Sequence, residues 1–236
     1  MNKQFSRTSG IFPEEKYKNL INKKVIVFGV GGVGGAAIEA LVRFGFKTIT
    51  FVDYDQVDES NLNRQIFTNR FNIGMYKCLA IKEAMLNINP NIKINYYIKR
   101  LTSNFSDFDL LSYDYVIDAI DTITSKINLI QYCYDNKVPL ICSMGAGNRI
   151  DASKLAIMDI YETSYDPLSK IIRHELKKKG IKKQSVVSSR EIPVSKSRRN
   201  EGSKKSTPFS VSYVPPVSGY LMVSEVIKYL MEHENE

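Results

Sequence analysis

A cluster of four glycines is the first feature of this sequence whose spacing could do chemistry. They form the pattern G-x-G-G-x-G at Gly29, Gly31, Gly32 and Gly34, between a β-branched run and an apolar helical pattern. Glycines at such a junction let backbone amides approach a phosphate, and the N-terminus of the following helix adds a favourable partial charge. The pattern therefore predicts a phosphate-binding turn.

An acid, Asp53, follows Gly34 by nineteen residues at the end of the next strand-like run. A carboxylate in that position can accept hydrogen bonds from ribose hydroxyls. Glycines and acid together would suit a nicotinamide-dependent dehydrogenase. The lysine and serine of a P-loop are missing from the glycine turn, which disfavours that class of nucleotide site.

The elements that must position these residues alternate between strands and helices. Strand patterns occur at 23–30, 48–55, 91–98, 114–121, 138–145, 154–161 and 184–194. Helical patterns occur at 36–46, 74–89, 125–137, 167–179 and 214–230. Such alternation predicts an α/β fold with a doubly wound, mostly parallel sheet. We expect one domain over residues 1–236, with a Rossmann-like nucleotide-binding core and a basic C-terminal appendage.

The positive charge of the chain is concentrated in that appendage. The net charge is +8, and the segment from Lys170 to Lys205 alone holds thirteen basic and three acidic side chains. Such a block attracts polyanions, with nucleic acid first among them. Residues 170–207 are accordingly expected to form a basic, partly mobile segment, although a solvated loop that keeps the protein soluble would have the same composition.

Composition and cysteine usage exclude several other classes of protein. Apolar residues make up 43% and charged residues 25% of the chain, which excludes wholesale disorder. No apolar run approaches the length of a membrane span, and the first residues lack the apolar core of a signal peptide. Cys78, Cys133 and Cys142 form no CxxC pair, which excludes a tetrathiolate zinc site, and free cysteines on such patterns are mostly small core residues. We expect a soluble cytoplasmic protein.

A longer set of motifs resembles one enzyme family. The block DYDQVDESNLNRQ at 53–65, Lys77 on a helical pattern and DAIDT at 118–122 follow the glycine turn in the order and spacing of the ThiF/MoeB/HesA family. Members are ATP-dependent carboxylate-adenylating enzymes related to the ubiquitin-activating enzymes. A dehydrogenase has no need for the arginine and lysine, so this combination is far more specific than the glycines alone.

The resemblance implies ATP and Mg²⁺ as cofactors and a role for each matching residue. Adenylation builds negative charge on phosphoryl oxygens, which fixed cations and a metal ion stabilise. By resemblance, Arg64 and Lys77 hold the phosphates, Asn61 positions their loop, Asp121 binds Mg²⁺, Asp53 binds ribose, and Gly32 lies against the nucleotide. Arg7 in FSRTSG matches an arginine that reaches the partner's ATP in family homodimers.

A narrower resemblance concerns the substrate. The stretches at 4–12, 145–183 and 210–230 are similar to the tRNA threonylcarbamoyladenosine dehydratases. These enzymes adenylate the threonyl carboxylate of a modified adenosine beside the anticodon, and the side chain's own ureido group then displaces AMP and closes a ring. The basic segment would contact the tRNA backbone close to the adenylation pocket, and we nominate Lys177, Lys178, Lys179, Lys182, Lys183, Arg198 and Arg199 for those contacts.

Three alternatives remain open from the sequence. The chain could adenylate the C-terminal glycine of a small sulfur-carrier protein, it could be a tRNA-binding module without turnover, or it could be the dehydrogenase suggested by the glycines. A sulfurtransferase-type protein partner is also left open. An enzymic cysteine for a thioester step is not supported.

Overall fold

The computed structural model of the chain describes residues 3–195, 198–199 and 206–233. Seven strands form one sheet in the order β3-β2-β1-β4-β5-β7-β6. The strands are β1 (Val25–Phe28), β2 (Thr48–Val52), β3 (Lys93–Tyr97), β4 (Tyr115–Asp118), β5 (Leu140–Ser143), β6 (Leu155–Asp159) and β7 (Ser185–Ser189). The helices are α1 (Ser6–Ser9), α2 (Glu14–Asn22), α3 (Gly32–Phe44), α4 (Lys77–Ile88), α5 (Ile123–Asp135), α6 (Pro167–Lys178) and α7 (Val214–Glu232).

The predicted doubly wound, mostly parallel sheet is confirmed. All neighbouring strands pair in parallel except β6, which runs antiparallel beside β7 at one edge. The chain builds β1, β2 and β3 towards one side and then returns to add β4 on the other side of β1. This reversal of strand order between β1 and β4 opens a crevice at the carboxyl ends of the strands, where ligands of such folds bind.

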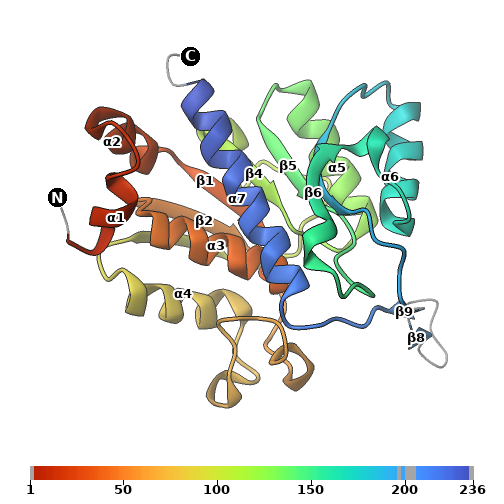
Figure 1. The fold of residues 1–236 in the computed structure, drawn as a ribbon, viewed down its shortest axis with the longest axis horizontal. Coiled ribbons are helices and arrows are strands. Elements are labelled where there is room, and N and C mark those ends of the chain that lie inside the picture. Colours follow the sequence, from red (N-terminus) through yellow and green to blue (C-terminus); the bar gives the residue numbers. More distant parts are fainter. Residues whose placement is uncertain (1–2, 196–197, 200–205, 234–236) are drawn as a thin grey trace.

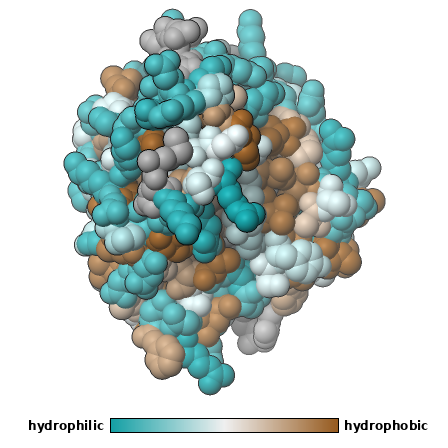
Figure 2. Space-filling model, turned by 60° about the vertical axis from the view of Figure 1, so that its left-hand side comes forward, coloured by the Kyte–Doolittle hydropathy of each residue, from teal (hydrophilic) through white to brown (hydrophobic). Residues whose placement is uncertain are grey.

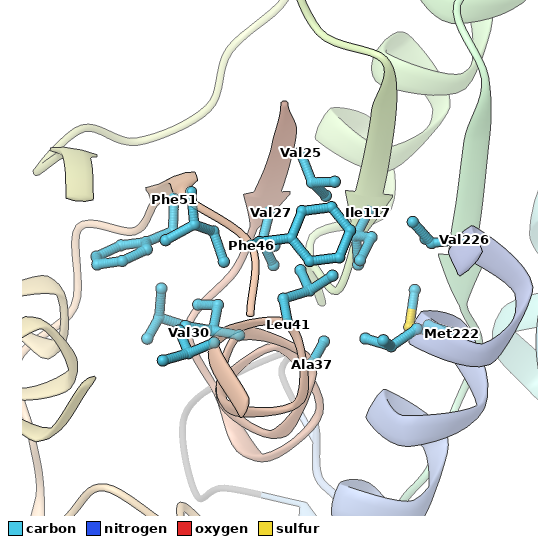
Figure 3. Close-up of a cluster of buried hydrophobic side chains, with 14 of the residues drawn as sticks. Val25, Val27, Val30, Ala37, Leu41, Phe46, Phe51, Ile117, Met222 and Val226 are labelled. Atoms are coloured by element: carbon cyan, nitrogen blue, oxygen red, sulfur yellow. The ribbon is translucent and has the colours of Figure 1, made fainter. Parts of the chain in front are cut away.

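Helices cover both faces of the sheet (Figure 1). On one face α3 and α7 pack together over β1, and Figure 3 shows Leu41 and Met222 converging with Val27 and Ile117 in that layer. A second buried cluster fills the other face, where α5 and α6 contribute Leu129, Ile130, Ile172 and Leu176. The apolar runs of the strands are buried on both sides because a parallel sheet is covered twice.

Two expectations from the sequence need correction or completion. The helix predicted over 74–89 begins at Lys77, because Gly74 adopts a left-handed turn with φ of +85° and Tyr76 bridges to Gln56. In the segment predicted to be mobile, the short strands β8 (Arg198–Arg199) and β9 (Ser206–Thr207) pair with each other. The segment also contains the end of α6 and all of β7, and its residues 196–197 and 200–205 lie outside the described part of the chain. None of the described helices is long and apolar enough to cross a membrane.

Candidate active site

A cavity of about 510 Å³ opens at the reversal point of the sheet. Its walls come from the turn after β1, the ends of β2 and β4, the loop before α4 and the start of α7. The volume falls in the range of small-molecule and cofactor sites. It gathers most of the residues that the sequence nominated for nucleotide binding and catalysis: Gly29, Gly31, Gly32, Asp53, Asn61, Arg64, Lys77 and Asp121.

The glycine turn lines this cavity, and the effect of adding a side chain differs from one glycine to the next. Gly29 has φ of +90°, and Gly34 packs so tightly that a Cβ would lie 1.8 Å from the carbonyl oxygen of Gly29. A Cβ on Gly32 would meet Pro215 and Arg64, whereas a Cβ on Gly31 would meet nothing within 4 Å. Open space therefore lies on the Cβ side of Gly31. Gly32 also lines the cavity, and its contact with the nucleotide, which the resemblance implies, stays a prediction.

The N-terminus of α3 supplies donors to that open space. Gly31 is its N-cap residue and makes no side-chain cap, so the first amides of the helix lack a capping side chain. Unpaired amides and the helix dipole together favour an anion at this position.

Substitution of two of these glycines by alanine separates folding from ligand binding. Gly34→Ala should lower the free energy of unfolding by about 3 kcal/mol or more, because backbone must move to admit the methyl group. Gly31→Ala should change stability by less than about 0.5 kcal/mol. It should nevertheless weaken ATP binding by about tenfold or more, since the methyl group would stand where a phosphate meets the helix amides. Denaturant unfolding and nucleotide titration measure the two effects; equal stability of the variants would contradict this packing.

Asp53 holds the glycine turn from the end of β2. One carboxylate oxygen accepts the backbone N–H of Val30 at 2.6 Å and the other accepts that of Asp55 at 2.7 Å. Burial raises the pKa of Asp53 above its usual value, against the lowering effect of these two hydrogen bonds and of Lys77. Each oxygen retains a lone pair towards the cavity, so the carboxylate can fix the turn and still accept a ribose hydroxyl.

The loop that carries Arg64 is built around Asn61. The Asn61 side chain accepts the backbone N–H of Asp58, and its carbonyl accepts the N–H groups of Arg64 and Gln65. Arg64 donates to the carbonyl oxygen of Ser60 at 2.7 Å, and burial lowers the pKa of its guanidinium below the ordinary value. An arginine remains protonated under these conditions, so the loop presents a fixed cation to the cavity. These hydrogen bonds agree with the role that the resemblance implies for Asn61, which stays a prediction.

Lys77 is the first residue of α4 and is only 7% exposed. Its Nζ lies 2.8 Å from Asp55 Oδ2, and its backbone N–H donates to the carbonyl of Asp55. Sequence reasoning missed Asp55, although an acid two residues after Asp53 in a strand-end loop was a visible signal. The carboxylate holds the ammonium at the cavity wall.

Asp121 lies beyond the end of β4, exposed on the cavity wall. It is not the N-cap of α5: that position belongs to Thr122, whose hydroxyl donates to Asp121 at 3.3 Å. Its carboxylate is thus available to a ligand. A single carboxylate that faces a phosphate site fits Mg²⁺, which keeps waters and phosphate oxygens as its other ligands. No group of three or more metal-ligating side chains occurs among the described residues.

A fully buried ion pair joins α5 to the end of β4, next to residues that line the cavity. Lys126 Nζ lies 2.8 Å from Asp118 Oδ2 and donates to the carbonyl oxygen of Ser143, while Asp118 Oδ1 accepts the N–H of Ile120. Both side chains of the pair are inaccessible to solvent. Sequence reasoning missed the pair, because a lysine in an apolar helix pattern gives no sign of which acid it meets.

The cavity mouth is also basic, which sequence reasoning did not predict. Lys99 and Arg100 follow β3 and line the mouth, and the Arg100 guanidinium lies 5.5 Å from the centre of the Tyr54 ring. With Arg64 and Lys77 they give the cavity lining four cations against the three carboxylates of Asp53, Asp55 and Asp121. Lys99 also pairs with Asp107 at 2.9 Å. The arrangement favours a polyanionic ligand that carries further phosphates outside the cavity.

Arg7 is not brought to this cavity. It is exposed on α1, whose neighbour Phe5 packs beside Gly45 at the C-terminal end of α3. A helix of thirteen residues is about 20 Å long, so Arg7 stands that far from the glycine turn of its own chain.

The nominated lysines of the basic segment are also remote from the cavity, contrary to the expectation that they lie close to it. The N-cap residue of α6, Asp166, accepts the backbone N–H of Gly145 just beyond the end of β5. The helix α6 therefore starts at the carboxyl ends of the strands, where the cavity lies. The helix then runs towards the amino ends of the parallel strands. Five of the nominated side chains lie there, all exposed: Lys177, Lys178, Lys179, Lys182 and Lys183. The side chains of Arg198 and Arg199 lie outside the described part of the chain.

The three cysteines are buried, as predicted for core residues. Burial raises the pKa of Cys78 and of Cys133 to about 12 and raises that of Cys142 well above its ordinary value. The thiolate is the nucleophilic form, so none of the three is suited to form a thioester.

Comparison with known proteins identifies relatives of this architecture. The sequence matches the ThiF family over residues 5–236. A tRNA threonylcarbamoyladenosine dehydratase of Bacillus subtilis is 39% identical, covering 97% of this chain and 95% of the relative. The crystal structure of the Escherichia coli tRNA N6-threonylcarbamoyladenosine dehydratase in complex with AMP superposes with a TM-score of 0.89 at 31% identity, over 98% of this chain and 95% of that one. The same enzyme in complex with ATP gives a TM-score of 0.88 at 32% identity, with the same coverage.

Proposed function

Because this chain belongs to the ThiF family, we propose that it dehydrates N6-threonylcarbamoyladenosine beside the anticodon of tRNA at the expense of ATP. The observation that carries the proposal is the convergence of Arg64, Lys77 and Asp121 on one cavity, in a chain that is similar over nearly its whole length to named dehydratases. The basic mouth formed by Lys99 and Arg100 suits the phosphates that flank a nucleoside in RNA.

The first chemical step is adenylation of the threonyl carboxylate. A carboxylate oxygen attacks the α-phosphorus of ATP, a new O–P bond forms, and pyrophosphate leaves with the electrons of the broken bond. Arg64 and Lys77 stabilise the charge that grows on the phosphoryl oxygens, and the amides at the start of α3 add dipolar stabilisation. Asp53 orients the ribose. Asp121 would hold Mg²⁺, which supplies charge neutralisation at the phosphates when bound.

The second step closes the ring. A heteroatom of the substrate's own ureido group attacks the activated acyl carbon, the C–O bond to AMP breaks, and the ureido proton leaves to solvent. AMP departs with the former carboxylate oxygen, so substrate and ATP become cyclic product, AMP and pyrophosphate, with net loss of one water. Attack by a tethered nucleophile can contribute on the order of 7–11 kcal/mol through effective concentration. The buried cysteines are therefore not needed.

Mass spectrometry of the tRNA tests this function. The protein is incubated with ATP, Mg²⁺ and tRNA carrying threonylcarbamoyladenosine, and the tRNA is then digested to nucleosides. We expect that nucleoside to lose the mass of one water while AMP appears in equal amount. An unchanged nucleoside, with pyrophosphate exchange only after a small carrier protein is added, would instead support adenylation of a sulfur carrier.

We also propose a homodimer in which Arg7 of each protomer serves the partner's site. The distance of Arg7 from its own cavity supports this arrangement, because the arginine cannot reach the ATP of its own chain. Neither Lys77→Ala nor Arg7→Ala chains should turn over alone, but a mixture of the two should recover part of the activity. The mixed dimer contains one site with both residues intact. No recovery in subunits shown to exchange would contradict action in trans.

A further inference from the structure

Five of the six parallel strands of the sheet begin at or shortly after lysines, and β4 is the exception. Lys93 opens β3, Lys47 precedes β2, and Lys23 and Lys24 precede β1. On the other side of β4, Lys137 stands in the turn before β5, and Lys182 and Lys183 stand before β7. Four of these lysines, at 24, 47, 93 and 137, come from segments that have no excess of positive charge in the sequence. Only the parallel direction of the strands brings these lysines together, in a row along the amino ends of the strands.

Backbone contacts show that these lysines follow one another along the edge. The N–H of Lys93 donates to the carbonyl oxygen of Lys47, and Asp114, which precedes β4, donates to that of Lys24. Lys137 and Lys183 line one shallow hollow of about 310 Å³. Neighbouring strands are about 4.8 Å apart, so the row from β3 to β7 is about 24 Å long.

The row carries an uncompensated positive charge. We call six exposed residues the lysine edge: Lys24, Lys47, Lys93, Lys137, Lys182 and Lys183. Among the described residues, none of the six has an acid within ion-pair distance.

Two of the acids at this end are engaged by other groups. Asp114 pairs with Lys23 at 3.2 Å, and Asp159 accepts the backbone N–H groups of Tyr161 and Gln184. The exposed ends of Lys177 and Lys179 add to the charge beside β7.

This side of the molecule is suited to contact with a large hydrophilic partner. In Figure 1 the strands β1 and β2 start beside α2 and α1. Figure 2 turns that side forward and shows hydrophilic side chains over its upper and outer parts, with hydrophobic side chains across the middle. The hollow between Lys137 and Lys183 is also lined by Tyr134, whose ring is 46% exposed. Lysines in a row with an accessible aromatic ring combine phosphate neutralisation with a surface on which a base can stack.

We propose that the lysine edge binds the phosphate backbone of RNA, as a second contact area. It lies at the amino ends of the parallel strands, whereas the ATP cavity lies at their carboxyl ends. The proposal rests on tRNA being the substrate. The two areas are separated by at least one strand, about 17 Å for five residues. A bound tRNA therefore places its modified nucleoside in a cavity and a different part of its backbone on the edge. The edge contributes affinity, whereas the cavity provides chemistry.

Salt dependence of tRNA binding tests the edge. The test variant replaces Lys47, Lys93 and Lys183 by glutamine. The control variant replaces Lys82, Lys154 and Arg70 by glutamine, which removes the same charge at positions away from the lysine edge. Binding is measured with unmodified tRNA, so that it does not depend on turnover. Loss of three phosphate contacts should lower the slope of log Kd against log salt by about 2 and weaken binding by about tenfold or more near 0.1 M salt.

The outcomes separate this proposal from the proposed reaction. The edge variant should keep the ATP affinity of the wild type and its turnover at saturating tRNA, while the control should bind tRNA like the wild type. A slope unchanged in the edge variant, or lowered equally in the control, would overturn the proposal. So would anionic lipid vesicles that bind the wild type more tightly than tRNA does and release the edge variant. A third outcome is that the nucleoside loses no water, while tRNA binding is weakened in the edge variant and not in the control. This outcome would contradict the proposed reaction and support RNA binding by the lysine edge.

Discussion

Replacement of Lys77 by alanine is expected to lower the rate of AMP formation by about 100- to 1,000-fold. The ammonium is fixed at the cavity wall by Asp55 at 2.8 Å, so it needs no reorganisation when charge develops on the phosphates. A cation held in this way stabilises the transition state far more than a mobile one in water would. Single-turnover measurement of AMP release at saturating ATP isolates this effect from binding.

Lys82→Ala is the matched control, because it removes a lysine from the same helix at a position away from the cavity. Its rate should equal that of the wild type. Lys77→Ala should remain folded, since the carboxylate left behind on Asp55 is 47% exposed and stays hydrated. A Lys77→Ala chain that keeps more than about a tenth of the wild-type rate would contradict a role in charge stabilisation.

Replacement of Lys126 by alanine is expected to lower the free energy of unfolding by about 3–5 kcal/mol. The pair with Asp118 has no contact with solvent, so removal of the lysine leaves a carboxylate buried without a counter-charge. The unmet hydrogen bond to the Ser143 carbonyl adds to the cost. Urea denaturation followed by circular dichroism gives the change directly.

Lys154→Ala provides the control for this second substitution. Lys154 lies 3.8 Å from Asp151 in an exposed pair, and such pairs contribute little because water screens both charges. Its unfolding free energy should stay within about 0.5 kcal/mol of the wild type. A loss below about 1 kcal/mol in Lys126→Ala would mean that Asp118 finds another partner or becomes hydrated.

Local patterns explain why much of the fold and site could be predicted from the sequence. Apolar runs of strand length, helical periodicity and the glycine turn each depend on neighbours in the chain, so the α/β sheet and the place of Gly29 and Asp53 followed from them. Arg64, Lys77 and Asp121 were nominated through a motif whose spacing matches a known family. The cavity indeed brings these three side chains together.

The features that were missed depend on contacts between distant segments. Asp55 and Lys77 meet because the loop after β2 returns to α4, and Asp118 meets Lys126 because α5 packs over β4. The lysines of α6 were placed near the cavity because the sequence does not say in which direction that helix runs across the sheet. The lysine edge was invisible for the same reason, since strand order alone assembles it.

Transfer of a labelled oxygen tests the central claim, that the cavity activates a carboxylate on the α-phosphate of ATP. The substrate tRNA would carry oxygen-18 in the threonyl carboxylate of its modified nucleoside. The mass of the released AMP would be measured by mass spectrometry after a single turnover. We expect each AMP to gain one heavy oxygen, because the carboxylate oxygen forms the new bond to phosphorus and leaves with it. Unlabelled AMP, or ADP and phosphate in its place, would show that the carboxylate does not attack the α-phosphate.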